Sequence, residues 1–301
     1  MHASAGVVLG LTGAFCWGSA DFAARFTSRR LGAYRALFFM QFFGFALLSI
    51  YLKSSGGFTR GVAPGWQPWA MAAAAGLLNV AASLALYRSF EVGTLSIVGP
   101  VSSSYPALTV VLSLLSGEHI GVLRGSGLAV TLVGVIFAST SFTTLKKRAA
   151  GDETGVPVAH LSKGVGWAIA AALGFGVMFW FLGYHVLPAV GAPASVWVMR
   201  LTSIVSLALV AAPAGRSLAL PRGVVWWALF ASGILDTSAF LATNAGLQTG
   251  QVSVVSVLAS LYGAVTVLLA WIFLRERLEI SQWFGIAMIF VGIVLVSLYA
   301  I

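Results

Sequence analysis

Ten apolar runs, each long enough to cross a lipid bilayer as a helix, dominate this chain. Bounded by charges, Gly, Pro and interfacial Trp, they lie near residues 5–25, 34–52, 66–87, 95–116, 125–142, 164–186, 195–213, 224–246, 252–273 and 282–300. At about 20 residues per span they take about 200 residues and leave no room for a separate soluble domain. The runs do not alternate as membrane strands do. The sequence therefore predicts an all-α integral membrane protein with ten transmembrane helices.

The composition excludes a water-soluble globule. Hydrophobic residues make up 59% of the chain and charged residues only 8%, against about 45–50% and about 25% in soluble domains. The formal net charge of +9 does not indicate nucleic-acid binding, because the basic residues lie singly or in small groups between the apolar runs. No basic residue precedes Ala5–Ala24 as in a secretory signal, so this run is expected to be a true span.

The two halves of the chain repeat each other at a shift of 157 or 158 residues. The matched pairs are Gly76 and Gly233, Gly93 and Gly250, Ser96 and Ser253, Ser103 and Ser260, Tyr105 and Tyr262, Thr109 and Thr266, Glu118 and Glu276, Gly127 and Gly285, Gly134 and Gly292, and Ser139 and Ser297. This pattern predicts a five-helix repeat at 1–142, a basic linker at 143–163 and a second five-helix repeat at 164–301. Because five is odd, the second copy enters the membrane from the opposite side. Inverted repeats enclose a substrate site near the midplane and support alternating access, which favours a transporter.

The distribution of Lys and Arg predicts the orientation. Four basic residues fall on the side of the termini, namely Lys53, Arg60, Arg124 and Arg200, and 13 fall on the opposite side: Arg25, Arg29, Arg30, Arg35, Arg88, Lys146, Lys147, Arg148, Lys163, Arg216, Arg222, Arg275 and Arg277. Because positive charge accumulates in cytoplasmic loops, we expect a cytoplasmic linker and external termini, in the inner (plasma) membrane.

Several segments resemble the drug/metabolite transporter superfamily, in particular its ten-helix EamA-type exporters. They are Trp17-Gly18 in the first run, Arg35 and Arg200 ahead of apolar runs, and above all Ser253–Ser297 with its Arg275-Glu276-Arg277-Leu278. Within that group the chain is similar to YddG-like exporters of aromatic and other hydrophobic amino acids. The resemblance implies a basket in which helices 1, 3, 4, 6, 8 and 9 surround a central cavity, with helices 5 and 10 at the periphery. Relatives often keep their termini in the cytoplasm, whereas the charge bias here predicts the reverse.

Asp236 is the acidic residue nearest the middle of a predicted span. Placing a charge there costs about 2.5–3.5 kcal/mol on insertion scales. It is either a cavity carboxylate that exchanges protons or binds a substrate ammonium, or a hydrogen-bonded group that holds its helix to a neighbour. Its repeat mate Asn79 is polar as well. The matching depth favours one shared substrate site.

Helical spacing extends both positions into polar stripes that we expect to face inward, away from lipid. One stripe combines Asn79 with Ser83 and Tyr87, and the other combines Asp236 with Phe240 and Asn244. Three small hydroxyl residues either contact substrate or serve close helix packing: Ser103, Ser256 and Ser260.

Aromatic residues within the spans predict a pocket for flat or hydrophobic substrates, with lipid-facing bulk as the alternative. They are Trp17, Trp180, Tyr105 and Tyr262. Asp21 lies four residues before Arg25, and this spacing predicts a helical ion pair at the membrane edge, the alternative being a place at the cavity mouth.

Pro106 removes one helical hydrogen bond and predicts a bend in the 95–116 helix. Its repeat mate is Gly263, which permits several backbone states. We expect these two positions to act as hinges that close the two ends of the cavity in turn.

No motif for phosphate binding, hydrolysis or metal binding occurs, so we expect no enzyme activity, no cofactor and no metal site. The predicted function is export of small organic metabolites, foremost amino acids with aromatic or hydrophobic side chains. The alternatives are an exporter of amphipathic cations and drugs, and a membrane scaffold that transports nothing. The expected partners are the lipid bilayer, a small-molecule substrate and protons as coupling ion, with the chain acting as a monomer and binding no nucleic acid.

Overall fold

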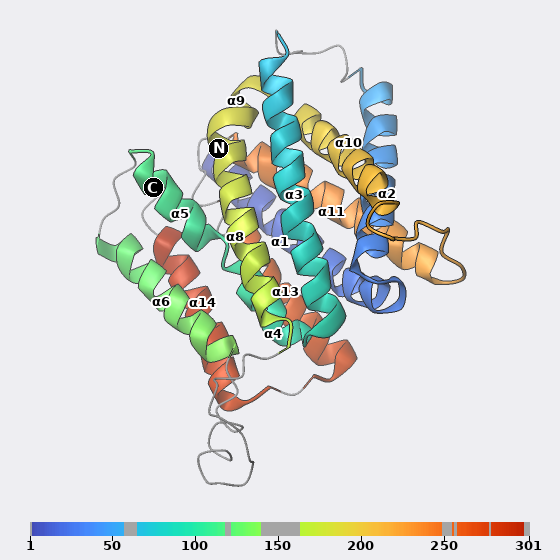
Figure 1. The fold of residues 1–301 in the computed structure, drawn as a ribbon. Helices are drawn as coiled ribbons and strands as arrows, with labels where there is room; N and C mark the ends of the chain where they lie inside the picture. Colours follow the sequence, from blue (N-terminus) through green and yellow to red (C-terminus); the bar gives the residue numbers. More distant parts are fainter. Residues whose placement is uncertain are drawn as a thin grey trace.

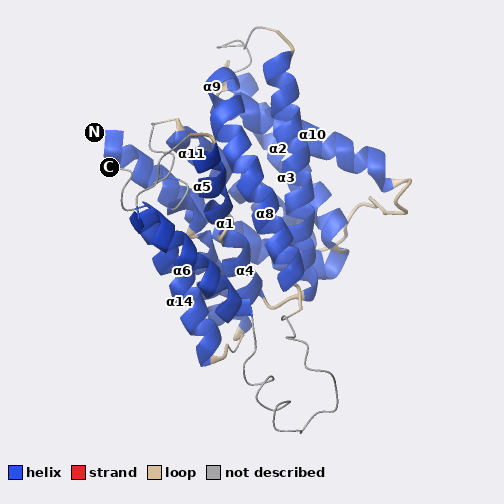
Figure 2. Cartoon of the chain, turned by 60° about the vertical axis from the view of Figure 1, so that its left-hand side comes forward, coloured by secondary structure: helices blue, strands red, loops and turns tan. Residues whose placement is uncertain are grey.

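The computed structural model describes residues 2–56, 65–117, 122–139, 163–248, 255, 258–276 and 278–297. Within these ranges the chain forms helices joined by short turns, and no strand occurs in them, as the apolar runs predicted (Figure 2). The helices are α1 (His2–Leu31), α2 (Ala33–Ser54), α3 (Gln67–Val92), α4 (Leu95–Ser103), α5 (Pro106–Leu115), α6 (Val122–Ser139), α8 (Val165–Phe181), α9 (Leu187–Val190), α10 (Ala192–Ala211), α11 (Val225–Leu247), α13 (Tyr262–Leu269) and α14 (Ile280–Ser297), with π-helical turns η1 (Leu182–Val186) and η2 (Ala270–Leu274).

In the described part of the chain, six helical stretches are long and apolar enough to cross a membrane. They are Ala5–Leu31, Ala33–Ser54, Gln67–Val92, Val165–Val190, Ala192–Ala211 and Val225–Leu247, and two shorter apolar helices are Leu258–Leu274 and Ile280–Gly292. α4 with α5 and α6 occupy the two remaining predicted spans. α1 and α3 run further than the sequence predicted, so Arg29 lies in the last turn of α1 and Arg88 lies within α3, rather than in loops. Long Arg side chains can reach the interface from there.

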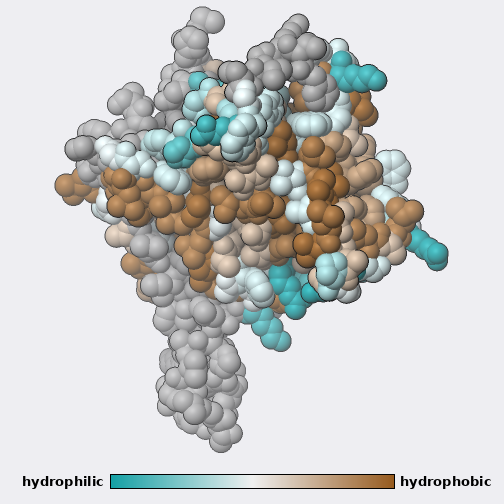
Figure 3. Space-filling view, turned by 45° about the horizontal axis from the view of Figure 1, so that its top comes forward, coloured by the Kyte–Doolittle hydropathy of each residue, from teal (hydrophilic) through white to brown (hydrophobic). Residues whose placement is uncertain are grey.

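The outer surface is largely apolar, as a bilayer requires. Figure 3 shows apolar side chains in a broad band across one face, with hydrophilic residues toward its margins. Large apolar side chains point outward from several helices, among them Phe15, Leu77, Leu209 and Trp227.

The packing of the helices shows the inverted repeat. At the 157-residue shift α1 corresponds to α8 and α3 to α11, and the structure packs α1 along α11 and α8 along α3. α6 and α14, the last helices of the two copies, lie side by side at the periphery (Figures 1 and 2).

Gly76 and its mate Gly233 make equivalent close contacts. A Cβ at Gly76 would lie 2.9 Å from the Thr202 Cβ of α10, and one at Gly233 would lie 2.8 Å from the Met40 carbonyl oxygen of α2. Each glycine thus allows its helix to touch the second helix of the other copy.

Both copies interrupt a helix at the same depth. α4 ends at Ser103 and α5 begins at Pro106, and the Ser104 N–H turns back to the Val101 carbonyl at 3.3 Å. In the second copy α13 begins at Tyr262, directly after a turn at Leu261. The helix predicted to bend at Pro106 is therefore broken there.

Gly263 has a packing role beside its expected role as a hinge. A Cβ at this position would collide with the Ser103 hydroxyl and lie 2.9 Å from the Ser103 Cβ. Any side chain at 263 would push α13 away from α4. A Gly263→Pro variant would therefore change packing and backbone stiffness together and cannot isolate hinge motion.

The basic residues assigned to the linker side lie at one end of the bundle, where the structure describes them. One residue assigned to the opposite side lies elsewhere. Arg29 donates to the Gly93 carbonyl at 3.1 Å, and Gly93 lies against Lys163 and Gly164 at the end of the linker. Arg200, assigned by the sequence to the side of the termini, is instead buried in the middle of α10. Several residues of the count lie outside the described residues or have side chains that are not described: Arg60, Arg124, Lys146, Lys147, Arg148 and Arg277.

Candidate functional site

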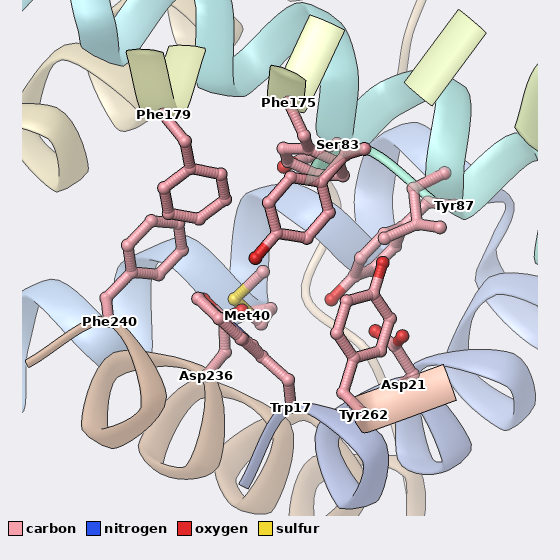
Figure 4. Close-up of a pocket in the computed structure, with 12 residues that line it drawn as sticks. Trp17, Asp21, Met40, Ser83, Tyr87, Phe175, Phe179, Asp236, Phe240 and Tyr262 are labelled. Carbon is pink, nitrogen blue, oxygen red and sulfur yellow. The ribbon is translucent and has the colours of Figure 1, made fainter. Parts of the chain in front are cut away.

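A small central cavity lies between the two repeats (Figure 4). Its volume is about 40 Å³, room for a few water molecules at about 10–15 Å³ each. Sites for small organic ligands usually measure about 300–1,000 Å³, so this conformation holds the site nearly closed. The lining comes from predicted helices 1, 3, 4, 6, 8 and 9, with Met40 of α2 added: Trp17, Asp21, Met40, Ser83, Leu86, Tyr87, Tyr105, Phe175, Phe179, Asp236, Phe240 and Tyr262.

Aromatic rings form most of the cavity wall, with Trp17 at their centre. Its indole makes edge contacts with Phe179, Phe240 and Tyr262 at centroid distances of 5.7, 5.2 and 6.0 Å. Tyr105 stacks on Phe179 at 4.8 Å and lies nearly parallel to its repeat mate Tyr262 at 6.5 Å. Such a wall is suited to flat, apolar or cationic groups.

Trp180, predicted to line the pocket, lies elsewhere. Its indole N–H donates to the Ser116 hydroxyl at 3.0 Å, and its ring contacts His185 and Tyr184. The neighbouring Phe179 takes the place in the cavity. Adjacent residues on a helix point about 100° apart, so Trp180 points away from the cavity that Phe179 faces.

Asp236 borders the cavity but already has a partner. Its Oδ2 is ion-paired with Nη2 of Arg200, whose Nη1 donates to the Gln41 side-chain oxygen. Arg200 also lies 3.7 Å from the Met40 sulfur and 5.1 Å from the centre of the Phe240 ring. Asp236 thus lines the cavity and also holds α11 to a neighbour, here α10. The sequence signal for Arg200 was an Arg inside an apolar run, which requires an internal counter-charge.

Asp21 is the second carboxylate of the cavity, and it makes no ion pair or hydrogen bond with any other described residue; its Oδ2 is buried without a partner. The predicted pair with Arg25 does not form. Arg25 instead donates to the Phe90 carbonyl at 3.0 Å and contacts Glu276 at 3.4 Å. In Figure 4 the Asp21 carboxyl lies near Tyr262. Asp21 therefore presents a carboxyl group without a partner to an aromatic cavity.

Glu276 fastens the linker end of the bundle, in an arrangement we call the Glu276 latch. Its carboxylate accepts hydrogen bonds from the Leu95 N–H at 3.3 Å, the Ser96 N–H at 2.8 Å and the Ser96 hydroxyl at 2.6 Å, besides contacting Arg25. A carboxylate is favourable at this helix start, where N–H groups lack helical partners. Arg25 lies one turn, about 6 Å, beyond Asp21 along α1. The latch thus lies on the linker side of the cavity, one helical turn beyond Asp21.

The remaining candidates divide between the cavity wall and the packed interior. Ser83 and Tyr87 line the cavity, and the Tyr87 hydroxyl lies 3.5 Å from that of Ser232. Asn79 and Asn244 are buried but do not line it, although Asn79 Oδ1 and both polar atoms of the Asn244 side chain lack partners.

Two of the candidate serines are also buried away from the cavity. Ser103 donates to the Pro100 carbonyl at 2.9 Å, and Ser260 is fully buried. Ser256 lies outside the described residues.

Comparison with known proteins identifies the family. The EamA-like transporter family matches residues 4–140 and again residues 162–298. The chain belongs to the EamA-like transporter family. The two EamA-like matches together span nearly the whole chain, as expected for a protein built from two copies of one unit.

Comparison with solved structures supports the fold but says nothing of the substrate. One of them, described only as "Crystal structure of protein", is 18% identical, covers 98% of this chain and 96% of its own, and superposes with a TM-score of 0.69. No curated protein matches the sequence. This EamA-like protein is thus a multi-pass membrane transporter whose substrate has to be argued from its own cavity.

Proposed function

We propose that this EamA-like protein exports small metabolites that carry an amino group on an apolar or aromatic body, foremost amino acids, as YddG-like exporters do. The observation that carries the proposal is the unpaired carboxylate of Asp21 inside an aromatic cavity between the two repeats. A buried charge without a partner is costly, and a bound ammonium group removes that cost.

The aromatic wall supplies the rest of the recognition. An ammonium at Asp21 would lie among Trp17, Tyr87 and Tyr262, where ring faces attract cations. The side chain of an aromatic amino acid would then insert among Tyr105, Phe179 and Phe240. The hydroxyls of Tyr87 and Ser83 are available to the substrate carboxylate.

Transport requires the cavity to grow, because about 40 Å³ cannot hold an amino acid. Release of the Glu276 latch would open the linker end, since it joins α1, α4 and the segment after η2. Rocking of one repeat against the other would then expose the cavity alternately on the two sides. We propose protons as the coupling ion, because a proton can occupy Asp21 when the ammonium leaves.

Amphipathic cations are the second candidate substrate class, and the charge of the cavity favours them. Asp21 and Asp236 supply two carboxyl groups, whereas Arg200 supplies one positive charge. Once Asp21 gives up its proton, its carboxylate attracts an amine whether or not the amine also bears a carboxylate.

Counterflow into proteoliposomes tests both classes. L-phenylalanine and 2-phenylethylamine share the aromatic body and the ammonium and differ in the carboxylate, and a sugar serves as the unrelated solute. Uptake of both amines supports the proposed site, and preference between them assigns the class. Failure to transport any amine would refute the proposal and favour the scaffold alternative.

We propose an inner-membrane location with the linker in the cytoplasm and the termini outside, with the monomer as the active unit. In a Cys16→Ser background, Gly151→Cys should resist an impermeant thiol reagent in intact cells. Ready labelling at position 151, with protection of a cysteine near Ile301, would reverse the orientation.

A further inference from the structure

A second concave site lies on the outside of the bundle, at the linker end, and the central cavity does not include it. We call it the basic groove. Its volume is about 680 Å³, and it is lined by residues of the α1–α2 turn, the outer face of α3, the start of α8 and the loop after α10. Figure 1 shows α3 between α8 and α10. This volume lies within the range of sites that hold small molecules, about 300–1,000 Å³.

Positive charge dominates the groove. Its charged side chains are Arg35, Arg88, Arg216 and Glu91. Glu91 is already engaged, because it pairs with Arg88 at 2.7 Å and accepts the Ala33 N–H at 3.1 Å. In the described part of the chain no carboxylate pairs with Arg35 or Arg216, and the Nε of Arg35 is buried without a partner. Two guanidinium groups are therefore free to bind an anion, and phosphate matches their paired N–H groups.

The position of the groove indicates that this anion comes with hydrocarbon attached. Trp167 on its rim is half exposed, and Leu209 and Val210, in the last turn of α10 before the Arg216 loop, are also exposed. In a membrane these side chains face acyl chains, and Trp is typical of the headgroup level. The groove therefore opens toward lipid at the depth where phosphates lie.

We propose that the basic groove binds the headgroup of an anionic phospholipid. Arg35 and Arg216 hold the phosphate, and the acyl chains lie along the exposed faces of α8 and α10. Basic pockets between helices on the cytoplasmic side typically bind such headgroups, and the charge bias predicts that this end is cytoplasmic. The lipid would join α2 and α3 of the first repeat to α8 and the α10 loop of the second.

Lipid binding to the delipidated protein in detergent, followed by native mass spectrometry, tests this site. The probes are a phosphatidylglycerol and a phosphatidylcholine with the same acyl chains, and inorganic phosphate and glycerol phosphate as soluble competitors. The test variant is Arg35→Gln with Arg216→Gln. The matched control is Lys163→Gln with Arg222→Gln, which removes two positive charges near the same end but outside the groove lining.

We expect the parent to prefer phosphatidylglycerol and the groove variant to bind it about 30-fold more weakly, since each basic residue contributes about fivefold. The control should bind as the parent does. An equal loss in the control would mean general surface charge, and displacement by soluble phosphate at equal concentration would mean a soluble anion; either result overturns the proposal, as does unchanged binding in the groove variant. Arg216 lies in an exposed loop, so Arg216→Gln alone should fold and should still bind phosphatidylglycerol about fivefold more weakly. Failure of the double variant to fold therefore leaves the proposal testable.

Discussion

The two acidic side chains of the central cavity differ in whether another side chain pairs with them. On the α10–α11 side, Asp236 is paired with Arg200, and Gln41 completes the group. On the α1 side, Asp21 has no partner, because Arg25, one turn away, is engaged by Glu276. Both carboxylates line the same cavity, so access to the cavity does not separate them. What separates them is whether the protein supplies the counter-charge, and at Asp21 it leaves that to a ligand.

The largest effect should come from breaking the paired side. Arg200→Met leaves Asp236 buried without its cation, and removal of one partner of a buried pair costs about 3–5 kcal/mol of unfolding free energy. Because the Asp236 side chain is 15% exposed, toward the cavity, we expect the lower part of that range. Chemical unfolding in detergent measures the loss. The double variant Arg200→Met with Asp236→Leu should recover most of it, and a double variant no more stable than the single would contradict this account.

Removing the unpaired carboxylate should affect binding rather than folding. A hydrogen bond to a charged group is worth about 1.5–3 kcal/mol, so Asp21→Asn should weaken binding of 2-phenylethylamine by about 10- to 150-fold. In the parent, binding should weaken as the pH falls, because a protonated carboxyl no longer attracts a cation; in Asp21→Asn this pH dependence should disappear. Scintillation proximity binding across a pH series measures both. Asp236→Asn is the matched comparison, and a larger binding loss there than in Asp21→Asn would reverse the assignment.

A smaller effect should follow when Asp21 gains Arg25, the partner that the sequence predicted for it. Glu276→Gln releases Arg25, which can then turn toward Asp21 at i, i+4 spacing. Such a pair is worth about 0.2–0.5 kcal/mol on an exposed helix, so amine affinity should fall by about twofold. Adding Arg25→Gln should restore it. Unchanged affinity in Glu276→Gln, with folding intact, would show that the latch does not keep Arg25 from Asp21.

The smallest effect is expected at Asn79, the repeat mate of Asp236. Asn79 is buried outside the cavity wall, so Asn79→Ala should leave amine affinity unchanged while altering stability slightly. Parallel binding and unfolding measurements separate these outcomes. A clear binding loss would mean that Asn79 enters the site in a more open conformation.

The sequence predicted the helical class, the repeat and a bend at Pro106, where the structure has a break, because these depend on local patterns of apolarity and backbone chemistry. It placed Arg200 at the wrong depth, since a charge inside an apolar run looks like the end of that run. The free-energy cost of burying Arg200 is offset mainly by its pairing with Asp236, 36 residues later.

The site was predictable only where one helix face decides it. Ser83 and Tyr87 follow from spacing along one helix. The pairing of Arg25 with Glu276 joins residues 251 positions apart, and no local rule could prefer it to Asp21. The placement of Phe179 rather than Trp180 depends on the rotation of α8, which its packing against α3 sets.

Tyr105 and Tyr262 lie nearly parallel, with an angle of 16° between their rings, and each is the other's repeat mate. A residue can face its own counterpart only beside the pseudo-symmetry axis, so this pair marks where that axis crosses the cavity. The pair has a consequence for attempts to redesign the transporter. Residues in contact do not contribute additively, and a change at 105 alone leaves half of a matched pair behind. Ser83 has already diverged from its mate Phe240 and can be varied singly, whereas positions 105 and 262 should be randomised together when variants for larger or smaller substrates are selected.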